Sequence, residues 1–117
     1  MAAILLVDDD RDQLEVRQAI FERAGFQVWA ATAAPDALAL IESERPSSVI
    51  LDLCLPGEDD GVRLLRDIRA RFDWLRVFVL SGWVERFAAS EDAALADGIL
   101  RKPFRSADLI ELLRNGD

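Results

Sequence analysis

Residues 3–10 read AILLVDDD, five apolar residues followed at once by three aspartates. A short apolar run of this kind is typical of a strand buried on both faces of a parallel sheet. Nearly continuous apolar runs also occur at residues 48–51 and 77–80, and shorter, more polar ones at residues 27–30 and 99–101. The pattern predicts five strands, with the first, third and fourth at the centre of the sheet and the other two at its edges.

Segments with helical spacing of apolar residues follow each of these runs. The predicted helices span residues 11–24, 35–44, 61–71, 84–95 and 106–114. Strict alternation of strand and helix indicates an α/β fold, a doubly wound five-stranded parallel sheet with five helices. The expected strand order is 2-1-3-4-5, as in flavodoxin-like folds, and we expect a single domain over residues 1–117.

Helix-end signals agree with this division. Asp10 and Gln13 have the spacing of a capping box, and Gly25 follows the first predicted helix. Pro35 lies where the first turn of a helix tolerates proline, and Ser106 stands at the start of the last predicted helix. We therefore assign Asp10 to the helix cap.

The composition excludes several classes of protein. With 51% hydrophobic and 31% charged residues, the chain has too many core formers for a disordered protein and too many charges for a membrane bundle. The chain has no histidine, which excludes histidine-based triads and histidine-ligated metals. Its single cysteine excludes an internal disulfide, which fits a cytoplasmic setting.

The charge balance argues against two kinds of partner. The net charge is −8, and such a surface repels nucleic acid and anionic lipid unless a basic patch is segregated. The densest basic stretch, residues 63–71, is interrupted by Asp67, and we interpret it as a solvated helix face. The opening residues lack the charged start and the length of a signal peptide. We therefore expect neither nucleic-acid binding nor a membrane span.

Charged and polar residues follow four of the predicted strands. The carboxyl ends of parallel strands meet at one edge of the sheet, where the winding reverses and ligands bind. A charge such as Asp52, directly after an apolar strand, is costly unless it has a partner. The residues that we expect to meet in one crevice are Asp8, Asp9, Asp10, Asp52, Ser81 and Lys102.

The chemistry of this set favours a metal ion. Carboxylates gathered in a partly dehydrated site repel one another, so a hard divalent cation is their natural partner. Oxygen ligands in a chain without histidine favour Mg²⁺. Lys102 is the only lysine among 14 basic residues, which indicates a need for a compact point charge.

Four motifs, in this order, resemble those of response-regulator receiver domains of two-component signalling, such as the chemotaxis receiver. They are LVDDD at residues 6–10, LDLCLPG at 51–57, LSG at 80–82 and RKPF at 101–104. The similarity covers essentially the whole chain. It implies a phosphoprotein that carries signals as an aspartyl phosphate.

The resemblance implies a role for each strand-end residue. It makes Asp52 the phosphoacceptor, Ser81 the recipient of a phosphoryl oxygen and Lys102 the partner of the phosphoryl group. A carboxylate can attack phosphorus once Mg²⁺ and an ammonium offset the negative charges. The Mg²⁺ ligands that it implies are Asp8, Asp9, Asp52 and the backbone carbonyl of Cys54.

The same resemblance implies partners and an output. The phosphoryl donor is expected to be a sensor histidine kinase or a histidine phosphotransfer protein. The target is a downstream protein or output domain, reached through residues 84–95, the fifth strand and the last helix, a face that a second copy could share as a homodimer. The domain would assist its own phosphorylation and dephosphorylation without being an enzyme that acts on a separate substrate.

Three other functions are compatible with parts of the pattern. An aspartate-nucleophile phosphatase also uses strand-end carboxylates and Mg²⁺, but normally places its nucleophile after the first strand. A receiver-shaped scaffold could bind a partner without phosphorylation, although the complete site set argues against this. A flavin-binding module is disfavoured because no phosphate-binding loop rich in Ser, Thr and Gly follows the first strand.

Two features depart from the usual family pattern. Ile99 stands where receivers commonly place Tyr or Phe, and the chain has no tyrosine, so the switch cannot rely on an aromatic ring there. The loop at residues 58–61 is one residue longer than the common form. Cys54 and Trp83 each lie two residues beyond a site residue, and we expect them at the entrance of the site, with Trp83 as the reporter of the output movement.

Overall fold

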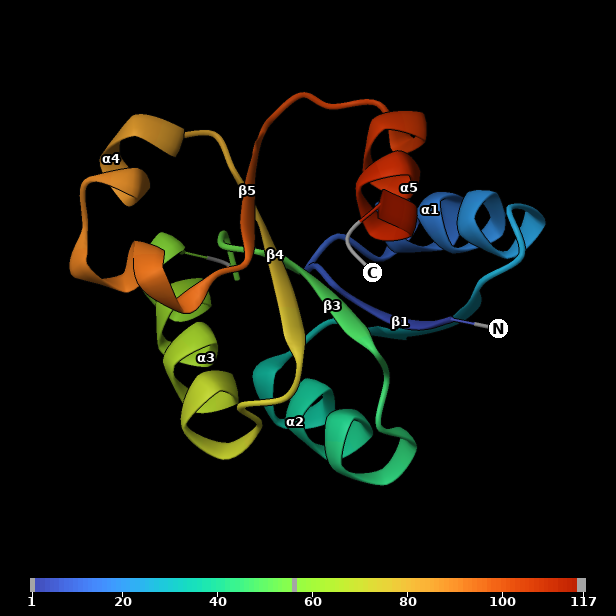
Figure 1. Cartoon of the computed structure of the whole chain (residues 1–117), viewed down its shortest axis with the longest axis horizontal. Helices are drawn as coiled ribbons and strands as arrows, with labels where there is room; N and C mark the ends of the chain where they lie inside the picture. Colours follow the sequence, from blue (N-terminus) through green and yellow to red (C-terminus); the bar gives the residue numbers. More distant parts are fainter. Residues whose placement is uncertain (1, 56, 116–117) are drawn as a thin grey trace.

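The chain forms one parallel sheet from five strands (Figure 1): β1 (Ala3–Val7), β2 (Gln27–Ala31), β3 (Ser48–Asp52), β4 (Arg76–Ser81) and β5 (Gly98–Arg101). Their order across the sheet is β2-β1-β3-β4-β5. The computed structural model describes residues 2–55 and 57–115. The predicted strand order and the central position of the three most apolar strands are confirmed.

Helices cover both faces of the sheet. Their bounds are α1 (Arg11–Arg23), α2 (Ala34–Glu44), α3 (Glu58–Arg71), α4 (Val84–Ala88), the 3-10 helix η1 (Glu91–Leu95) and α5 (Ser106–Asn115). Figure 1 shows α1 and α5 side by side, while α2 and α3 lie across the sheet from them. Within the part of the chain that the structure describes, no helix has both the length and the apolar character required to cross a bilayer.

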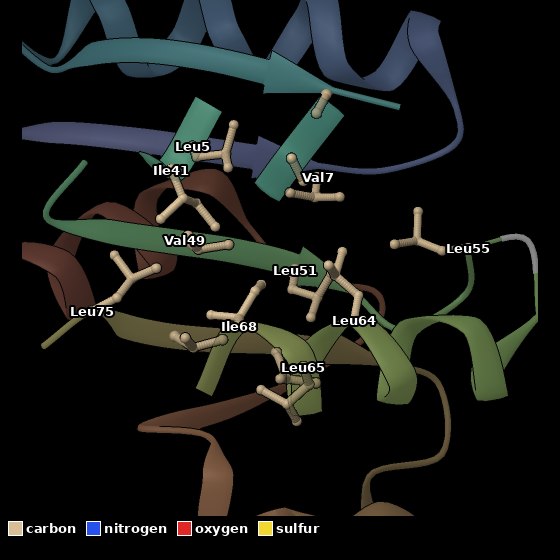
Figure 2. Packing of buried hydrophobic residues seen from close by; sticks show 14 of the residues in the cluster. Leu5, Val7, Ile41, Val49, Leu51, Leu55, Leu64, Leu65, Ile68 and Leu75 are labelled. Atoms are coloured by element: carbon tan, nitrogen blue, oxygen red, sulfur yellow. The ribbon is translucent and has the colours of Figure 1, made fainter. Parts of the chain in front are cut away.

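Alternating residues of the central strands feed two separate cores. Leu5, Val49 and Val77 pack in the core beneath α2 and α3, part of which is seen in Figure 2. Their neighbours Ile4 and Ile50 pack in the core beneath α1 and α5. Because each central strand is buried on both faces of the sheet, nearly all of its residues are apolar. The central strands therefore read as continuous apolar runs in the sequence.

The start of α1 follows the predicted cap only in part. The Asp10 carboxylate accepts the Gln13 backbone N–H at 3.2 Å. The Gln13 side chain does not return the bond but accepts a hydrogen bond from Arg17 at 2.8 Å. Asp10 is therefore a helix cap, as predicted, while the reciprocal half of the capping box is replaced by a contact to Arg17.

Helix α3 begins three residues earlier than predicted, at Glu58 rather than residue 61. The Asp60 carboxylate accepts the backbone N–H of Gly57 at 3.0 Å, so it caps the new first turn. Acidic residues also suit the positive end of the helix dipole. Residues 58–60, read as an acidic loop from the sequence, are thus the first turn of the helix.

The prediction of one helix over residues 84–95 is wrong. Helix α4 ends at Ala88, Ser90 adopts an extended backbone, and a 3-10 turn follows. The hydroxyl of Ser90 donates to the carbonyl of Phe87 at 2.6 Å, which caps the end of α4. Phe87 is the only large apolar side chain of α4–η1 that is fully buried, so nothing anchors a longer helix to the sheet.

Arginines of α3 hold the segment after this break. Arg66 pairs with Asp92 through two hydrogen bonds of 2.8 Å. Arg69 donates to the carbonyl of Leu95 at 3.0 Å and to the carboxylate of Asp97 at 2.9 Å. The interpretation of residues 63–71 as a solvated face is therefore wrong for Arg69, whose side chain is only 21% exposed, while Arg66 remains solvent-exposed although it pairs with Asp92.

The Arg66–Asp92 pair predicts a local change in protection. Arg66→Gln should speed amide hydrogen exchange in residues 91–95 by a few fold, because an exposed pair contributes modestly to local stability. Arg66 lowers the pKa of Asp92, so this protection is present above Asp92's ordinary pKa of 3.8 and is lost as the pH falls through the lowered value. Arg63→Gln, an exposed position on α3, is the control. Equal exchange in both variants would contradict the assigned role.

Candidate functional site

Three polar side chains are buried where the central strands end. Asp8 follows β1, Asp52 ends β3 and Ser81 ends β4, and none of these residues, counted with its backbone, is more than 3% exposed. Lys102 follows β5 and is partly exposed. The topology thus brings together Asp8, Asp52, Ser81 and Lys102 as predicted, while Asp9 and the cap Asp10 are exposed.

Both carboxylate oxygens of Asp52 are held. The Nζ atom of Lys102 donates to Oδ2 at 2.6 Å, and the backbone N–H of Cys54 donates to Oδ1 at 3.0 Å. The carboxylate side chain is 4% exposed, against 33% for the lysine. A charge-assisted hydrogen bond in this buried environment fixes the orientation of Asp52 and offsets its charge.

Asp8 is held in a similar way from the other side. The backbone N–H of Asp10 donates to Oδ1 at 2.9 Å, and Nη1 of Arg17 donates to Oδ2 at 3.0 Å. Burial and the nearby charge of Asp52 raise the pKa of Asp8, while the Asp10 N–H and Arg17 oppose the rise. The two buried carboxylates therefore lie close enough to repel each other, and Arg17 and Lys102 offset their charges.

A cavity of about 240 Å³ opens beside Asp52. It is lined by Asp52, Leu53, Cys54, Ser81, Gly82, Trp83 and Lys102. Cys54 is exposed and Trp83 is 64% exposed, so both lie at the entrance as predicted. The Ser81 hydroxyl oxygen accepts the backbone N–H of Trp83 at 2.9 Å, which ties the exposed tryptophan to the buried end of β4.

The expected cluster of three or more acidic ligands is not assembled in this conformation. Across residues 2–55 and 57–115, no three His, Cys, Asp or Glu side chains are grouped so as to hold a metal ion. Asp9 is exposed, and Arg17 and Lys102 already bind the two buried carboxylates. The donor chemistry nevertheless fits Mg²⁺, because the buried Asp8 and Asp52 supply carboxylate oxygens, the type of ligand that this ion prefers.

Arg17 is the site residue that the sequence analysis missed. It lies on α1, four residues after Gln13 and seven after Asp10, so these three residues share one face of the helix. Its guanidinium lies 4.8 Å from the centre of the Phe104 ring, which follows Lys102 and Pro103. The helical spacing was a usable signal, since Asp10 marks the helix face next to the end of β1.

Comparison with known proteins assigns the family. A family model of the response regulator receiver domain matches residues 4–114. The chain belongs to this family. The match favours a receiver over an aspartate-nucleophile phosphatase or a flavin-binding module.

Individual relatives of this receiver agree with the assignment. Response regulator MprA of Mycolicibacterium vanbaalenii is 37% identical over an alignment of 113 residues, and the match covers 95% of this chain and 48% of that protein. The receiver domain of NtrX from Brucella abortus is 32% identical with a TM-score of 0.83, covering 96% of this chain and 95% of that chain. A CheY-like receiver domain protein from Methanospirillum hungatei is 28% identical with a TM-score of 0.85, covering 99% and 93%.

The chain spans about half the length of the curated relatives that it matches. Receivers are the input modules of response regulators, and membership implies phosphorylation-dependent signalling in a two-component system. The predicted resemblance and the flavodoxin-like fold are thus confirmed.

Proposed function

We propose that this receiver accepts a phosphoryl group on Asp52 from a phosphohistidine of a sensor kinase or a histidine phosphotransfer protein. The observation that carries the proposal is the environment of Asp52: a buried carboxylate, held by Lys102 at 2.6 Å, beside a cavity that also contains Ser81. A buried charge with a fixed cation and an adjacent space is the arrangement that a nucleophilic carboxylate needs.

Asp52, Lys102 and Ser81 have different roles in phosphoryl transfer. An Asp52 oxygen attacks phosphorus, the phosphorus–nitrogen bond of the donor breaks, and the departing imidazole nitrogen keeps that electron pair and takes up a proton from solvent. Lys102 offsets the charge that arrives with the phosphoryl oxygens. The hydroxyl hydrogen of Ser81 is not used in its bond to Trp83 and can be donated to a phosphoryl oxygen.

The acidic residues provide the place for Mg²⁺, which when bound offsets the charge of the incoming group. Asp8, Asp9, Asp52 and the backbone carbonyl of Cys54 would hold it. Asp8 and Asp52 are already buried and adjacent, and Asp9 lies at the exposed rim. Phosphoryl transfer is therefore expected to depend on the metal.

The direct test of metal dependence compares two neighbouring aspartates. Asp9→Ala should weaken Mg²⁺ binding by about tenfold or more, since it removes a ligand. Asp10→Ala should weaken binding much less, because Asp10 caps α1. Mass spectrometry after incubation with acetyl phosphate should show one phosphoryl group on the unmodified protein with Mg²⁺ and none with a chelator. Equal losses of Mg²⁺ affinity in the two variants would show that the acidic run is misassigned.

The output is proposed to leave through α4, β5 and α5. Attraction of Ser81 by the phosphoryl group would move the loop at residues 81–83, because Ser81 Oγ already holds the Trp83 backbone N–H. Because this route runs from Ser81 to Trp83, it does not need an aromatic switch on β5. Ile99, at the position of that switch, is half-buried and packs against the core. A downstream protein, an output domain or a second copy of the domain is the proposed recipient.

Trp83 fluorescence checks this route. In a background of Trp29→Phe and Trp74→Phe, Mg²⁺ with beryllofluoride, a phosphoryl mimic, should shift the emission of the exposed Trp83. The same addition to the Asp52→Asn variant is the control and should leave the emission unchanged. Constant emission in the parent, with amide shifts confined to α1, would place the output on the other side of the domain.

The remaining features of the proposal follow from charge and chemistry. The net charge of −8 and the engagement of Arg66 and Arg69 within the fold argue against direct nucleic-acid binding by this domain.

We place the domain in the cytoplasm, where sensor kinases supply phosphohistidine. It acts as a phosphoacceptor that assists its own phosphorylation and dephosphorylation, and residues 1–117 are proposed to act as a single receiver unit.

A further inference from the structure

Arg17 is tethered at three points around the acidic site. Its Nη1 donates to Asp8 at 3.0 Å, its Nη2 donates to Gln13 at 2.8 Å, and its guanidinium carbon lies 4.8 Å from the centre of the Phe104 ring. The side chain is 15% exposed and its partner carboxylate 3%. Planar guanidinium groups suit such a combination of carboxylate pairing and ring stacking.

The position of the Arg17 guanidinium matters because Mg²⁺ is proposed to bind at the same buried carboxylates. Asp8 and Asp52 are two buried carboxylates, and each already has one tethered cation, Arg17 or Lys102. The four side chains together are close to neutral. A divalent cation entering between the carboxylates would be repelled by a guanidinium that keeps its bond to Asp8.

The surface beside Arg17 has space for a displaced guanidinium. A depression of about 650 Å³ lies between α1 and the segment after β5, and Arg17 itself forms part of its lining. Asp12 and Gln13 also line it, so a displaced guanidinium would find an acidic and a polar neighbour. Phe104 borders the same depression, and movement of Arg17 would change the contact with that ring.

We propose that Arg17 competes with a divalent metal ion for Asp8. The guanidinium holds Asp8 until the metal displaces the guanidinium, and this competition sets the metal concentration at which the receiver can be phosphorylated. The inference rests on the proposed Mg²⁺ dependence. Since Arg17 also contacts Phe104, two residues beyond Lys102, displacement links metal entry to the segment between β5 and α5.

The test is a Mg²⁺ titration of the whole chain without phosphodonor, followed by backbone amide shifts at fixed ionic strength. Arg17→Gln removes the competing charge and should lower the Mg²⁺ dissociation constant by about tenfold. Arg23→Gln is the matched control, because it removes the same charge from an exposed position two turns further along α1. That change should alter the dissociation constant by less than about twofold, owing to screening.

A second measurement covers loss of stability in the variant. Without its partner, buried Asp8 destabilises the metal-free fold, so Arg17→Gln should melt at a lower temperature and gain more in Tm from Mg²⁺ than the parent does. In the parent, the Phe104 ring resonances should shift during the titration, and in Arg17→Gln they should shift much less.

The outcomes separate this inference from the proposed function. An unchanged or weaker Mg²⁺ affinity in Arg17→Gln, with normal binding by the parent, overturns the competitor role and leaves the Mg²⁺-dependent function standing. Absence of Mg²⁺ binding in every variant overturns both. Tighter binding in Arg17→Gln alone, with the larger gain in Tm, establishes the competition.

Discussion

Asp52→Asn should reduce phosphoryl labelling from acetyl phosphate by at least about a hundredfold. The amide has nearly the same shape as the carboxylate but is not a nucleophile toward phosphorus. It also leaves Lys102 without the charged partner that lies 2.6 Å away in the unchanged protein. Labelling is read as the mass of one added phosphoryl group that is lost under alkaline conditions, as an acyl phosphate requires.

Two controls separate loss of the nucleophile from loss of the fold. Asp67→Asn removes the same charge from an exposed position on α3 and should leave labelling unchanged. The Asp52→Asn protein should remain folded, because it removes the repulsion between the buried Asp8 and Asp52 carboxylates. Retention of labelling in folded Asp52→Asn would mean that another residue is the acceptor.

Gly61→Ala is expected to have the largest effect on stability. A Cβ at this position would lie 2.0 Å from the carbonyl oxygen of Leu53 and 2.3 Å from its Cα atom, and both are backbone atoms that cannot rotate away. Overpacking of this kind exceeds the gain of about 1 kcal/mol that alanine brings to a helix. We expect a net loss of about 2–3 kcal/mol, or roughly 10 °C in Tm, in thermal unfolding followed by circular dichroism.

Gly82→Ala is the matched control for this substitution. A Cβ there would meet no atom within 4 Å, so the stability should change by less than about 0.5 kcal/mol. Leu53 directly follows Asp52, and the close approach of α3 therefore also supports the end of β3. A Tm for Gly61→Ala within a degree or two of the parent would show that α3 is free to move away from Leu53.

The strand order was predictable because burial leaves a strong mark on sequence. The central strands face one core through Leu5 and Val49 and the other through Ile4 and Ile50, so their apolar runs are unbroken. The edge strands carry mixed patterns. Polar residues at the ends of such runs then have one place to meet, which is why Asp8, Asp52 and Ser81 were predictable as a group.

The segment from residue 84 to 95 was not predictable in the same way. Alanines there have high helix propensity but offer little surface to bury, and tertiary contacts decided the outcome. The contact between Arg66 and Asp92 joins residues 26 positions apart, so this pairing depends on the folded arrangement. Local sequence alone could not show that the helix stops at Ala88.

The partners of the charged residues were also beyond the sequence. Thirteen arginines and one lysine face 22 acidic residues, and composition does not say which of them pair. Arg17 reaches Asp8 only because α1 packs with that face toward the end of β1. The exposed position of Asp9 likewise depends on the backbone path between β1 and α1, which the run of three aspartates does not reveal.

The measurement that bears most directly on the central claim is identification of the phosphorylated residue. Acetyl phosphate and Mg²⁺ should generate the acyl phosphate, borohydride should reduce it at once, and peptide mass spectrometry should find the mark on residue 52 alone. A mark on Asp8 or Asp9, or a stable phosphoryl group on Ser81 that resists borohydride, would contradict the assignment of Asp52 as the phosphoacceptor.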